Sequence, residues 1–477
     1  MSLRKKTVHS IYWSSFQHFG RQAFSFLFSI ILARLLLPED FGYVAMIMVF
    51  IHISMTLIDS GLTQSLIRED DDNQADYSTI FFFNLGVSIL LYIVLFIGAP
   101  KIAGFYDQPI LHNLIRWQGI IIIIHALSTV QGARMVKNLD FKTQFFAGTP
   151  ALIIAGCIAI YLAYTGWGVY AIVAYTVIEA AIKSALFWYL SDWKPSLEFD
   201  IKKFKHHFNF GMHLTISESL ETLFNELYTI IIGKFFSPEQ LGFFIRSYTM
   251  QRMPVASLTV VLNKVTYPVF AKIKNNNQKL KEVYGKLLLM VVFTLTPTLL
   301  FLGIFGEPLF RFLLTEKWVP AVPYFKFLCI AGILYPLSSY NINLLKIKGK
   351  SDVILKIQLY KKFIFVLSLS LIFIWGINGL LYGILLNAIV AFLMNSYYSG
   401  KLIDFNTFQQ IKLIIPLLFI NFIAASAVFV FSKQILHLPD LLQLVIGMSG
   451  GYVFYFILIL IFERRILKIG KEIISSS

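Results

Sequence analysis

Long apolar runs are the feature that most constrains what this chain can fold into. Stretches of about 20 mostly apolar residues, enough for a helix to cross a bilayer, recur from one end of the sequence to the other. Inside hydrocarbon every backbone polar group needs a partner, and a continuous run of this length meets that need as an α-helix. The sequence therefore predicts an all-α, polytopic membrane protein.

Composition excludes the other broad classes of protein. Hydrophobic residues make up 57% of the 477 residues and charged residues 14%, against about 25% charged in a soluble domain. A soluble enzyme, a disordered chain and a fibrous repeat are inconsistent with these values. We predict fourteen membrane spans, at residues 11–33, 43–66, 78–100, 110–133, 145–164, 168–190, 208–232, 243–263, 283–305, 321–345, 353–375, 378–400, 411–432 and 441–462.

The net charge of +15 is explained by membrane topology. When the N-terminus is placed in the cytoplasm, 25 of the Lys and Arg residues in the connecting segments lie on the cytoplasmic side and six lie outside. Because positive residues favour cytoplasmic loops, this bias predicts that both termini are cytoplasmic. The same bias argues against nucleic acid as a partner.

The chain contains an internal repeat with an offset of 200 residues. Residues 24–42 and 224–242 are identical at seven of nineteen positions, and a weaker echo pairs residues 166–170 with 375–379. Both long segments carry a basic residue followed by Pro-Glu-x-x-Gly. The motif is formed by Arg34, Pro38, Glu39 and Gly42 in the first copy and by Lys234, Pro238, Glu239 and Gly242 in the second. We interpret it as a short connector between spans rather than a contact for substrate, since Pro and Gly shape helix ends and turns.

The repeat also predicts the domain organisation. Each copy contains six spans, so the two copies have the same orientation, which is a transporter architecture. We expect two six-helix lobes around a central cavity, followed by two further helices. The predicted domains are an N-lobe at 1–190, a cytoplasmic linker at 191–207, a C-lobe at 208–400, and spans 13 and 14 with a cytoplasmic tail at 401–477.

Charged residues inside the spans are the candidate functional residues. A charge in the middle of a bilayer costs at least about 2.5–3.5 kcal/mol on insertion scales, so such residues face a bundle interior or an aqueous cavity. Ten cations and five acids fall within or at the edges of spans. The candidates for binding substrate are the cations Arg21, Lys183, Arg246, Arg252, Lys326 and Lys361, and the candidates for cavity polarity or ion coupling are His18, Asp59, Glu179, Glu218 and Glu221.

Two of these groups occupy equivalent positions in the repeat. His18 and Arg21 in the first span correspond to Glu218 and Glu221 in the seventh. Each pair has i, i+3 spacing and therefore lies on one helix face. One interpretation is a cavity between the lobes, cationic on one side and acidic on the other. The alternative is an ion pair between the lobes that only fixes their packing, and the sequence leaves both open.

Motifs for metal or nucleotide chemistry are missing. No His is followed by Glu-x-x-His, and the two cysteines lie singly in apolar runs. Residues 349–351 read Gly-Lys-Ser, but position 344 is Leu where a phosphate-binding loop has Gly. We therefore expect no metal, no cofactor and no ATPase, and coupling to H⁺ or Na⁺ remains open.

Three segments carry a resemblance to a known family: Ala-Arg-Leu-Leu-Leu-Pro-Glu-Asp-Phe-Gly at 33–42, Asp-Ser-Gly-Leu at 59–62 and Gly-Trp-Gly-Val-Tyr-Ala at 166–171. They resemble the corresponding segments of polysaccharide flippases. These are the Wzx or WzxC-like transporters of the multidrug/oligosaccharidyl-lipid/polysaccharide (MOP) superfamily, which is related to MATE transporters. The resemblance extends over essentially the whole chain. It implies a protein of the bacterial inner membrane that serves O-antigen, lipopolysaccharide or exopolysaccharide synthesis.

The implied activity is movement of undecaprenyl-pyrophosphate-linked oligosaccharide from the inner to the outer leaflet, in partnership with polymerase or export machinery. The family supplies no catalytic residue to transfer, so the candidates above rest on the charges alone. A water-filled cationic cavity suits this cargo, because Arg binds phosphate through its planar fork of donors.

Two other functions are consistent with the sequence. A MATE-like exporter of small cationic molecules would favour an acidic cavity, and ten cations against five acids argue against it. A membrane polymerase or glycosyltransferase of the same pathway would need a large outer loop, whereas the longest one here covers only residues 306–320.

Overall fold

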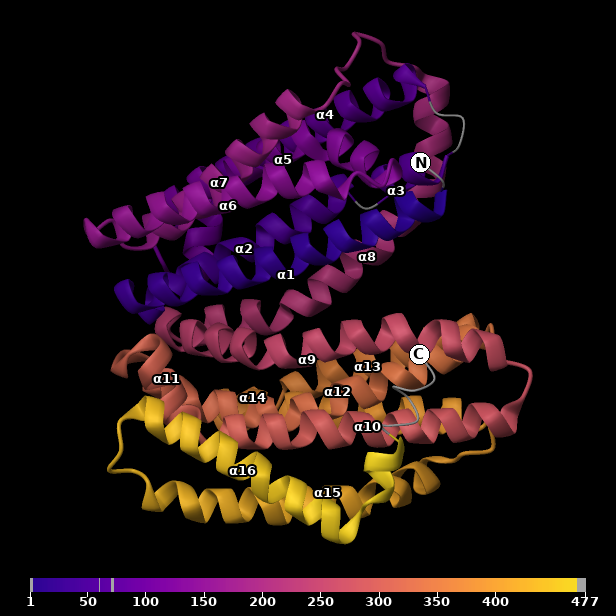
Figure 1. The fold of residues 1–477 in the computed structure, drawn as a ribbon. Helices are drawn as coiled ribbons and strands as arrows, with labels where there is room; N and C mark the ends of the chain where they lie inside the picture. Colours follow the sequence, from indigo (N-terminus) through magenta and orange to yellow (C-terminus); the bar gives the residue numbers. More distant parts are fainter. Residues whose placement is uncertain (1–2, 60, 70–72, 470–477) are drawn as a thin grey trace. The chain divides into compact units, whose positions relative to one another are not determined.

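The computed structural model describes residues 3–59, 61–69 and 73–469. That part of the chain is helical throughout, with sixteen α-helices, one short 3₁₀ helix and no β-strand (Figure 1). It divides into two compact units, Met1–Gly242 and Phe243–Ser477. Neither unit boundary tests the lobes predicted from the repeat, which stay a prediction.

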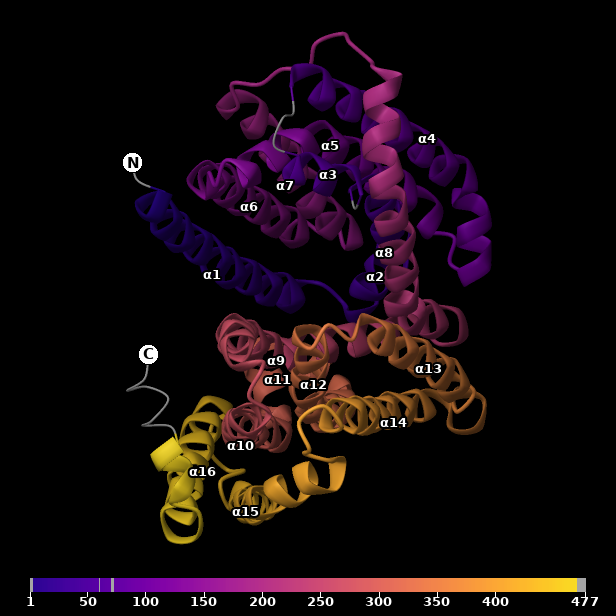
Figure 2. The same ribbon diagram turned by 90° about the vertical axis from the view of Figure 1, so that its right-hand side faces the viewer.

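The first unit contains eight helices and the first turn of a ninth. Helix α6 is central on one side, because α1 and α7 both pack against it, while α5 packs on α4 and α7. Helix α8 packs on α2, α3 and α4 (Figures 1 and 2). The helices are α1 (Leu3–Leu35), α2 (Pro38–Asp59), α3 (Leu62–Arg68), α4 (Gln74–Tyr106), α5 (Leu111–Lys137), α6 (Phe141–Tyr164), α7 (Val169–Leu190) and α8 (Ile201–Phe235).

The second unit is organised around α10, which packs against α12 and α15. Helix α14 covers α12 and α13, and α16 packs on α15 and α11. The helices are α9 (Pro238–Ile273), α10 (Asn277–Ile304), α11 (Gly306–Leu314), the 3₁₀ helix η1 (Glu316–Ala321), α12 (Val322–Ile347), α13 (Ser351–Leu369), α14 (Ile372–Gly400), α15 (Thr407–Gln434) and α16 (Asp440–Phe462).

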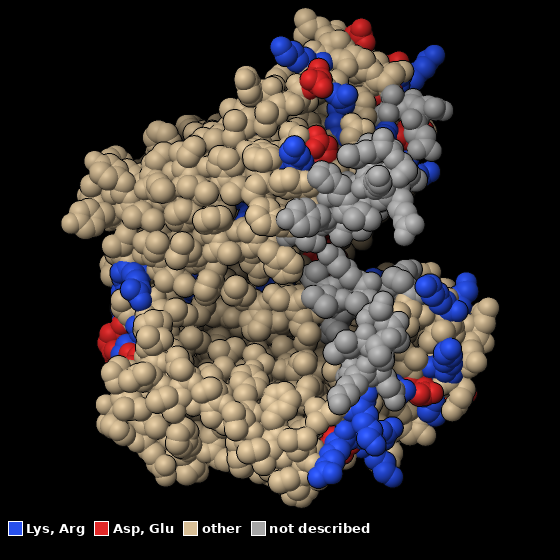
Figure 3. Space-filling view, viewed as in Figure 1, with Lys and Arg blue, Asp and Glu red and all other residues tan. Residues whose placement is uncertain are grey.

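The membrane-protein fold predicted from the sequence is confirmed. Within the described residues fourteen helices have at least 19 residues, one for each predicted span. Ten segments are long and apolar enough to cross a membrane by length and composition, and the more polar helices α1, α8, α9 and α13 fall outside that set. A count of fourteen spans is compatible with these findings. Most of the charged side chains on the visible face lie toward its two sides, and few are visible between them (Figure 3).

Local sequence explains where many of these helices begin. Asn73 and Asn406 each form a capping box, accepting hydrogen bonds from the first turn of α4 and α15. The side chains of Asp140, Asp200 and Asn276 cap α6, α8 and α10 in the same way. Such side chains satisfy backbone N–H groups that have no partner in the first turn of a helix.

Small residues decide how closely α6 packs. Ala147, Ala151, Ala155, Ala159 and Ala163 are spaced four residues apart along one face of α6, and all are buried. Without a hydrophobic effect between helices in lipid, association depends on close contact, which small residues permit. This face receives α1 and α7.

The repeat is visible in two local structures. Gly168, just before α7, has φ 53° and ψ −132°, and Gly376, in the kink near the start of α14, has φ 58° and ψ −140°. Both conformations lie in a region that only Gly adopts readily. The weaker echo in the sequence therefore encodes the same turn twice.

The two Pro-Glu-x-x-Gly motifs contact each other reciprocally. A Cβ atom added to Gly42 would lie 1.9 Å from the carbonyl oxygen of Pro238, and one added to Gly242 would lie 1.9 Å from that of Pro38. The first turns of α2 and α9 therefore touch through backbone alone. Gly is required here because no other residue permits so close an approach.

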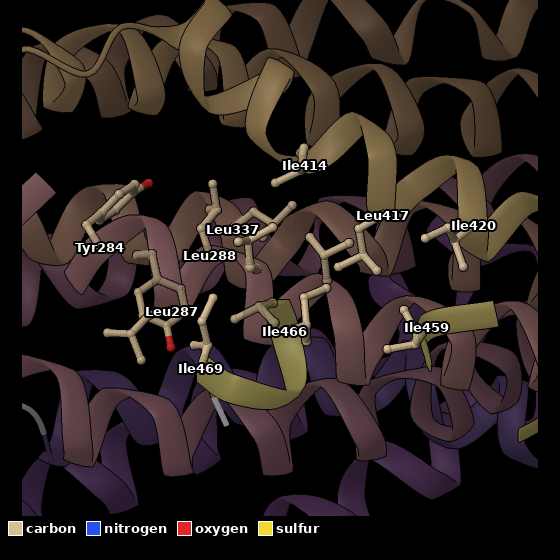
Figure 4. Packing of buried hydrophobic residues seen from close by; sticks show 14 of the residues in the cluster. Tyr284, Leu287, Leu288, Leu337, Ile414, Leu417, Ile420, Ile459, Ile466 and Ile469 are labelled. Atoms are coloured by element: carbon tan, nitrogen blue, oxygen red, sulfur yellow. The ribbon is translucent and has the colours of Figure 1, made fainter. Parts of the chain in front are cut away.

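The core of the second unit is apolar and close-packed. Leu287 and Leu288 of α10, Leu337 of α12 and Leu417 of α15 point toward one another in Figure 4, and all four are buried. Ile459 of α16 and Ile466 beyond its end complete the same cluster. This packing fixes the two last spans to the rest of the unit.

Candidate functional site

A polar stripe runs along one face of α8. Its members are spaced three or four residues apart, which places them on one side of a helix, and all are small or polar. We call this set the α8 stripe: His207, Gly211, Thr215, Glu218, Thr222, Glu226, Thr229 and Gly233. Much of it meets α2, α3 and α4, so the first unit contains polar contacts at membrane depth.

Three side-chain contacts join the stripe to α2 and α3. Glu226 Oε1 lies 2.7 Å from His52 Nδ1, and Gln64 donates to Glu218 at 3.1 Å. Between them the hydroxyls of Thr56 and Thr222 are 3.2 Å apart. Two membrane-depth carboxylates thus have different neighbours, an imidazole for Glu226 and a neutral amide for Glu218.

The first two turns of α8 contribute His207 and Lys203 to a buried polar cluster. His207 is 1% exposed, with Nδ1 2.7 Å from Ser65 Oγ and Nε2 3.3 Å from Asp76. Lys203 forms an ion pair with Asp76 at 2.8 Å. His207 precedes the predicted span 208–232, and burial lowers the pKa of its imidazole against the opposing effect of Asp76. Beside it Gly211 meets Gly61 backbone to backbone, since a Cβ on Gly61 would lie 2.1 Å from the Gly211 carbonyl oxygen.

A second charged pair connects α1 and α7. Arg21 donates from Nη2 to Glu179 Oε1 at 2.5 Å, and the side chains are 45% and 13% exposed. The partly exposed guanidinium keeps donors available for a further anion. His18, one turn earlier, is exposed. The structure therefore brings together two of the predicted site residues that are far apart in sequence.

The structure places the other predicted residues separately. On α8, Glu218 contacts Gln64 and Glu221 is exposed, so the acids equivalent to His18 and Arg21 in the repeat lie on a different helix from Glu179. Lys183 of α7 lies over the Phe187 ring, 5.3 Å from its centroid. The side chain of Asp59 lies outside the described part of the structure.

Four predicted cations belong to the second unit. Arg246 is 6% exposed and lies 5.5 Å from the Trp318 ring centroid, so it is held within the bundle. Arg252 is exposed and donates to the Tyr248 hydroxyl at 3.4 Å. Lys326 on α12 is exposed and Lys361 on α13 is half-buried. No finding tests whether any of these residues touches substrate.

The motif residues occupy helix ends, as a connector would. Asp40 accepts a hydrogen bond from the Leu37 backbone N–H at 2.9 Å, which caps the start of α2. Lys234 pairs with Asp107 at 2.8 Å. Arg34, Glu39 and Glu239 are exposed.

Sequence reasoning missed His52, Gln64 and Tyr106, and it left Glu226 out of the site. The spacing of the α8 stripe carried a signal, because polar or small residues recur every three or four positions from 207 to 233. His52 gave none, since it stands alone in an apolar run. Among the described residues there is no group of three or more His, Cys, Asp or Glu side chains that could hold a metal ion.

Comparison with known proteins gives related sequences. Over 302 residues the chain is 29% identical to the teichuronic acid biosynthesis protein TuaB of Bacillus subtilis (strain 168), covering 62% of each chain. It is 25% identical to the lipopolysaccharide biosynthesis protein WzxC of Escherichia coli (strain K12), over 77% of this chain and 75% of that one. The succinoglycan biosynthesis transport protein ExoT of Rhizobium meliloti (strain 1021) is 22% identical, over 97% and 94%.

Comparison with solved structures shows the same fold. The lipid II flippase MurJ, in an inward closed conformation, matches with a TM-score of 0.74 at 14% identity, over 96% of this chain and 100% of that one. An inward-facing MATE family transporter of the MOP superfamily matches with a TM-score of 0.59 at 15% identity, over 83% and 99%. The resemblance stated from the sequence is confirmed. Residues 31–323 match the family model described as polysaccharide biosynthesis protein, and the chain belongs to that family.

Proposed function

We propose that this protein is a flippase. It moves undecaprenyl-pyrophosphate-linked oligosaccharide from the inner to the outer leaflet of the bacterial cytoplasmic membrane, for synthesis of a cell-surface polysaccharide. Membership of the polysaccharide biosynthesis family supports the process, and the names of WzxC and ExoT are consistent with it. The fold shared with MurJ supports transport rather than glycosyl transfer, so we propose no enzymatic activity.

The observation that carries the chemistry is the Arg21–Glu179 pair. Arg21 is on a predicted membrane span, bound through one nitrogen and 45% exposed. A guanidinium offers five donors in a planar fork, so it can hold a second anion while Glu179 keeps it in place. A diphosphate linked to a lipid is such an anion, and charge-assisted hydrogen bonds of this kind are among the stronger polar contacts.

The orientation is part of the proposal. With both termini in the cytoplasm, α1 runs from the cytoplasm outward, and α5 and α7 run from the outside inward. These directions follow from the bias of 25 cytoplasmic to six external Lys and Arg residues. Alternating access then exposes the cations first to the cytoplasm and then to the outside. Polysaccharide polymerase or export machinery would take over the cargo in the outer leaflet.

The test replaces Arg21 in cells whose polysaccharide depends on this protein. Arg21→Ala should lower export about tenfold to a hundredfold, the range expected for losing one hydrogen bond to a charged group. Arg21→Lys should retain part of the activity, because the charge stays and the fork is lost. Lipid-linked oligosaccharide should accumulate in the inner leaflet. The measurement is the fraction of this lipid that an external glycosidase cannot cleave.

Arg116→Ala is the matched control. Arg116 is also an arginine on a predicted span, but it lies 4.2 Å from the centroid of the Phe96 ring, away from the Arg21–Glu179 pair, and should leave export unchanged. Normal export by a well-expressed Arg21→Ala variant would reject the role of Arg21. Accumulation of unlinked oligosaccharide would indicate a polymerase or glycosyltransferase instead, and sensitivity to small cationic drugs without a glycan defect would indicate an exporter.

A further inference from the structure

The contact between His52 and Glu226 lies deep in a membrane-spanning part of the first unit. Glu226 is nine residues before the end of α8, about 14 Å along the helix axis, and His52 is fourteen residues after the start of α2, about 21 Å. Both distances fall within a hydrocarbon core of about 30 Å. An ionisable residue at such a depth is costly and is typical of a functional site.

The geometry is that of a shared proton. His52 Nδ1 and Glu226 Oε1 are 2.7 Å apart, with the side chains 45% and 18% exposed. An imidazolium beside a carboxylate and a neutral imidazole beside a carboxylic acid differ only in where one proton resides, whereas a neutral imidazole donating to a carboxylate holds one proton fewer. The two atoms are therefore close enough to share one proton between an imidazole nitrogen and a carboxylate oxygen.

A third group lies beside the pair. Tyr106, at the end of α4, is 2% exposed, and its hydroxyl is buried with no hydrogen-bond partner among the described residues. It interacts electrostatically with Glu226. The α8 stripe holds the ring in place, because a Cβ on Gly233 would lie 2.9 Å from Tyr106 Cε1. A buried donor without a partner normally costs free energy. The Tyr106 hydroxyl could therefore donate a hydrogen bond to Glu226 when that side chain becomes negatively charged.

Two cations of the first unit have carboxylate partners of their own. Lys234 pairs with Asp107, and Arg21 pairs with Glu179. The titratable side chains on the elements packed against α2 and α8 also include Glu218 and Glu221 on α8, Arg68 on α3 over the Phe210 ring, Arg116 and His125 on α5, Lys183 on α7 over the Phe187 ring, and the His207–Asp76–Lys203 cluster. His52 is the basic side chain that contacts Glu226 in the structure.

We propose that His52 and Glu226, with the Tyr106 hydroxyl beside them, form a proton-binding site whose occupancy is linked to the packing of α2 on α8. With one proton in the site, as a carboxylic acid on Glu226 beside a neutral imidazole, the pair is neutral overall. Release of that proton to water leaves a single negative charge on Glu226, which is expensive at membrane depth because this side chain is only 18% exposed. Close packing therefore favours the protonated site, and deprotonation favours an arrangement in which water reaches Glu226.

A proton fits this site better than a metal ion. The donor and acceptor atoms are already in contact at 2.7 Å, which leaves no space for an ion between them. Two ligand-type side chains and a phenol also fall short of a metal cluster, and none is found in the described residues. That the site couples proton movement to transport of lipid-linked oligosaccharide rests on the proposed function.

Infrared titration of the full-length protein in lipid nanodiscs tests the site without transport. Wild type should show a carboxylic acid C=O band that disappears reversibly as pH rises, and Glu226→Gln should abolish it. Glu218→Gln, which removes a carboxylate from the same stripe where the neighbour is an amide, should retain the band. His52→Gln should move the midpoint, because the imidazole that forms a hydrogen bond with the carboxyl group is lost.

Three results would overturn the proton site. The band could be absent from wild type at every pH, it could persist in Glu226→Gln, or it could be lost in Glu218→Gln. A midpoint that shifts with Na⁺ concentration at constant ionic strength would assign a sodium site instead. Tyr106→Phe should shift the midpoint while keeping the band, and an unchanged midpoint would remove Tyr106 from the site.

Transport is then measured separately, in vesicles loaded with lipid-linked oligosaccharide. An imposed pH gradient should change the rate of flipping by wild type several-fold, and Glu226→Gln should no longer respond to the gradient. If wild type shows the titrating band but flips no lipid-linked oligosaccharide, the proposed function fails and the proton site stands. If wild type flips the lipid-linked oligosaccharide but shows no titrating band, the proton site fails and the proposed function stands.

Discussion

Charged side chains at membrane depth are held in pairs in the first unit. Arg21 has Glu179, and Glu226 has His52. Pairing lowers the cost of a charge in hydrocarbon, and partial exposure of one member keeps each pair open to a ligand. A third group lies at the start of α8, where Lys203 forms an ion pair with Asp76 and His207 is buried beside them.

His207 makes stability depend on pH. Its folded-state pKa is lowered, chiefly by burial, so the unfolded chain binds a proton at a higher pH than the native protein does. Stability is therefore fully present above about pH 6.5 and is lost as pH falls through the lowered native pKa, with a slope of at most about 1.4 kcal/mol per pH unit.

Thermal unfolding of the detergent-solubilised protein between pH 8 and pH 5 measures this dependence. The Tm of wild type should fall more steeply below pH 6.5 than that of His207→Gln. The control is His437→Gln, since His437 is an exposed histidine outside this cluster. Equal slopes in wild type and His207→Gln would show that another group causes the acid sensitivity.

At the scale of elements, glycines determine which helices touch. The beginnings of α2 and α9 meet through Gly42 and Gly242, and α8 approaches the end of α2 through Gly211 and Gly61. In each case backbone meets backbone, where a neighbour cannot move aside as a flexible side chain can. The first contact joins α2 to α9, and the second joins α8 to the segment between α2 and α3.

Substituting these glycines should be costly. Gly42→Ala or Gly242→Ala places a methyl group 1.9 Å from a carbonyl oxygen, so each should destabilise the protein by about 1–3 kcal/mol or more. Gly98→Ala in α4 is the matched control, because a Cβ there meets nothing within 4 Å, and Ala favours a helix interior by about 0.5–1 kcal/mol. Folded yield and Tm by fluorescence size-exclusion chromatography give the measurement, and equal values for all three variants would contradict the contact.

Across the whole molecule, helix lengths and charge placement agree on a membrane protein. Fourteen helices of the described chain have at least 19 residues, and the connections between them are short. Membrane insertion fixes which ends face the cytoplasm through the positive residues of those connections.

Topology can be tested at two neighbouring connections. A reporter fused after Lys281, at the start of α10, should read cytoplasmic, and one fused after Lys317, in the connection before α12, should read external. The physical reason is the concentration of Lys residues between α9 and α10. The measurement uses paired phosphatase and fluorescent-protein fusions, and a reversed signal at both sites would refute the proposed orientation.

The sequence by itself determined the fold class, the positions of the long helices and the duplicated motif. These features follow from local patterns: apolar runs of fixed length, capping residues, and Gly where the turn needs it. The weaker echo between residues 166–170 and 375–379 coincides with similar conformations at Gly168 and Gly376. Arg21 and Glu179 were also recognisable individually, since a charge in a span is visible in one dimension.

Tertiary structure alone decided which of these residues meet. The sequence paired Arg21 with the acids of the seventh span as repeat equivalents, whereas its contact in the structure is Glu179 of α7. His52 and Glu226, separated by 174 positions, gave no sign of contact. The reason is physical: a span records its depth and its polar face, but lipid is nearly indifferent to which helix covers that face. Partners are therefore chosen by the close packing of small residues between helices that are distant in sequence.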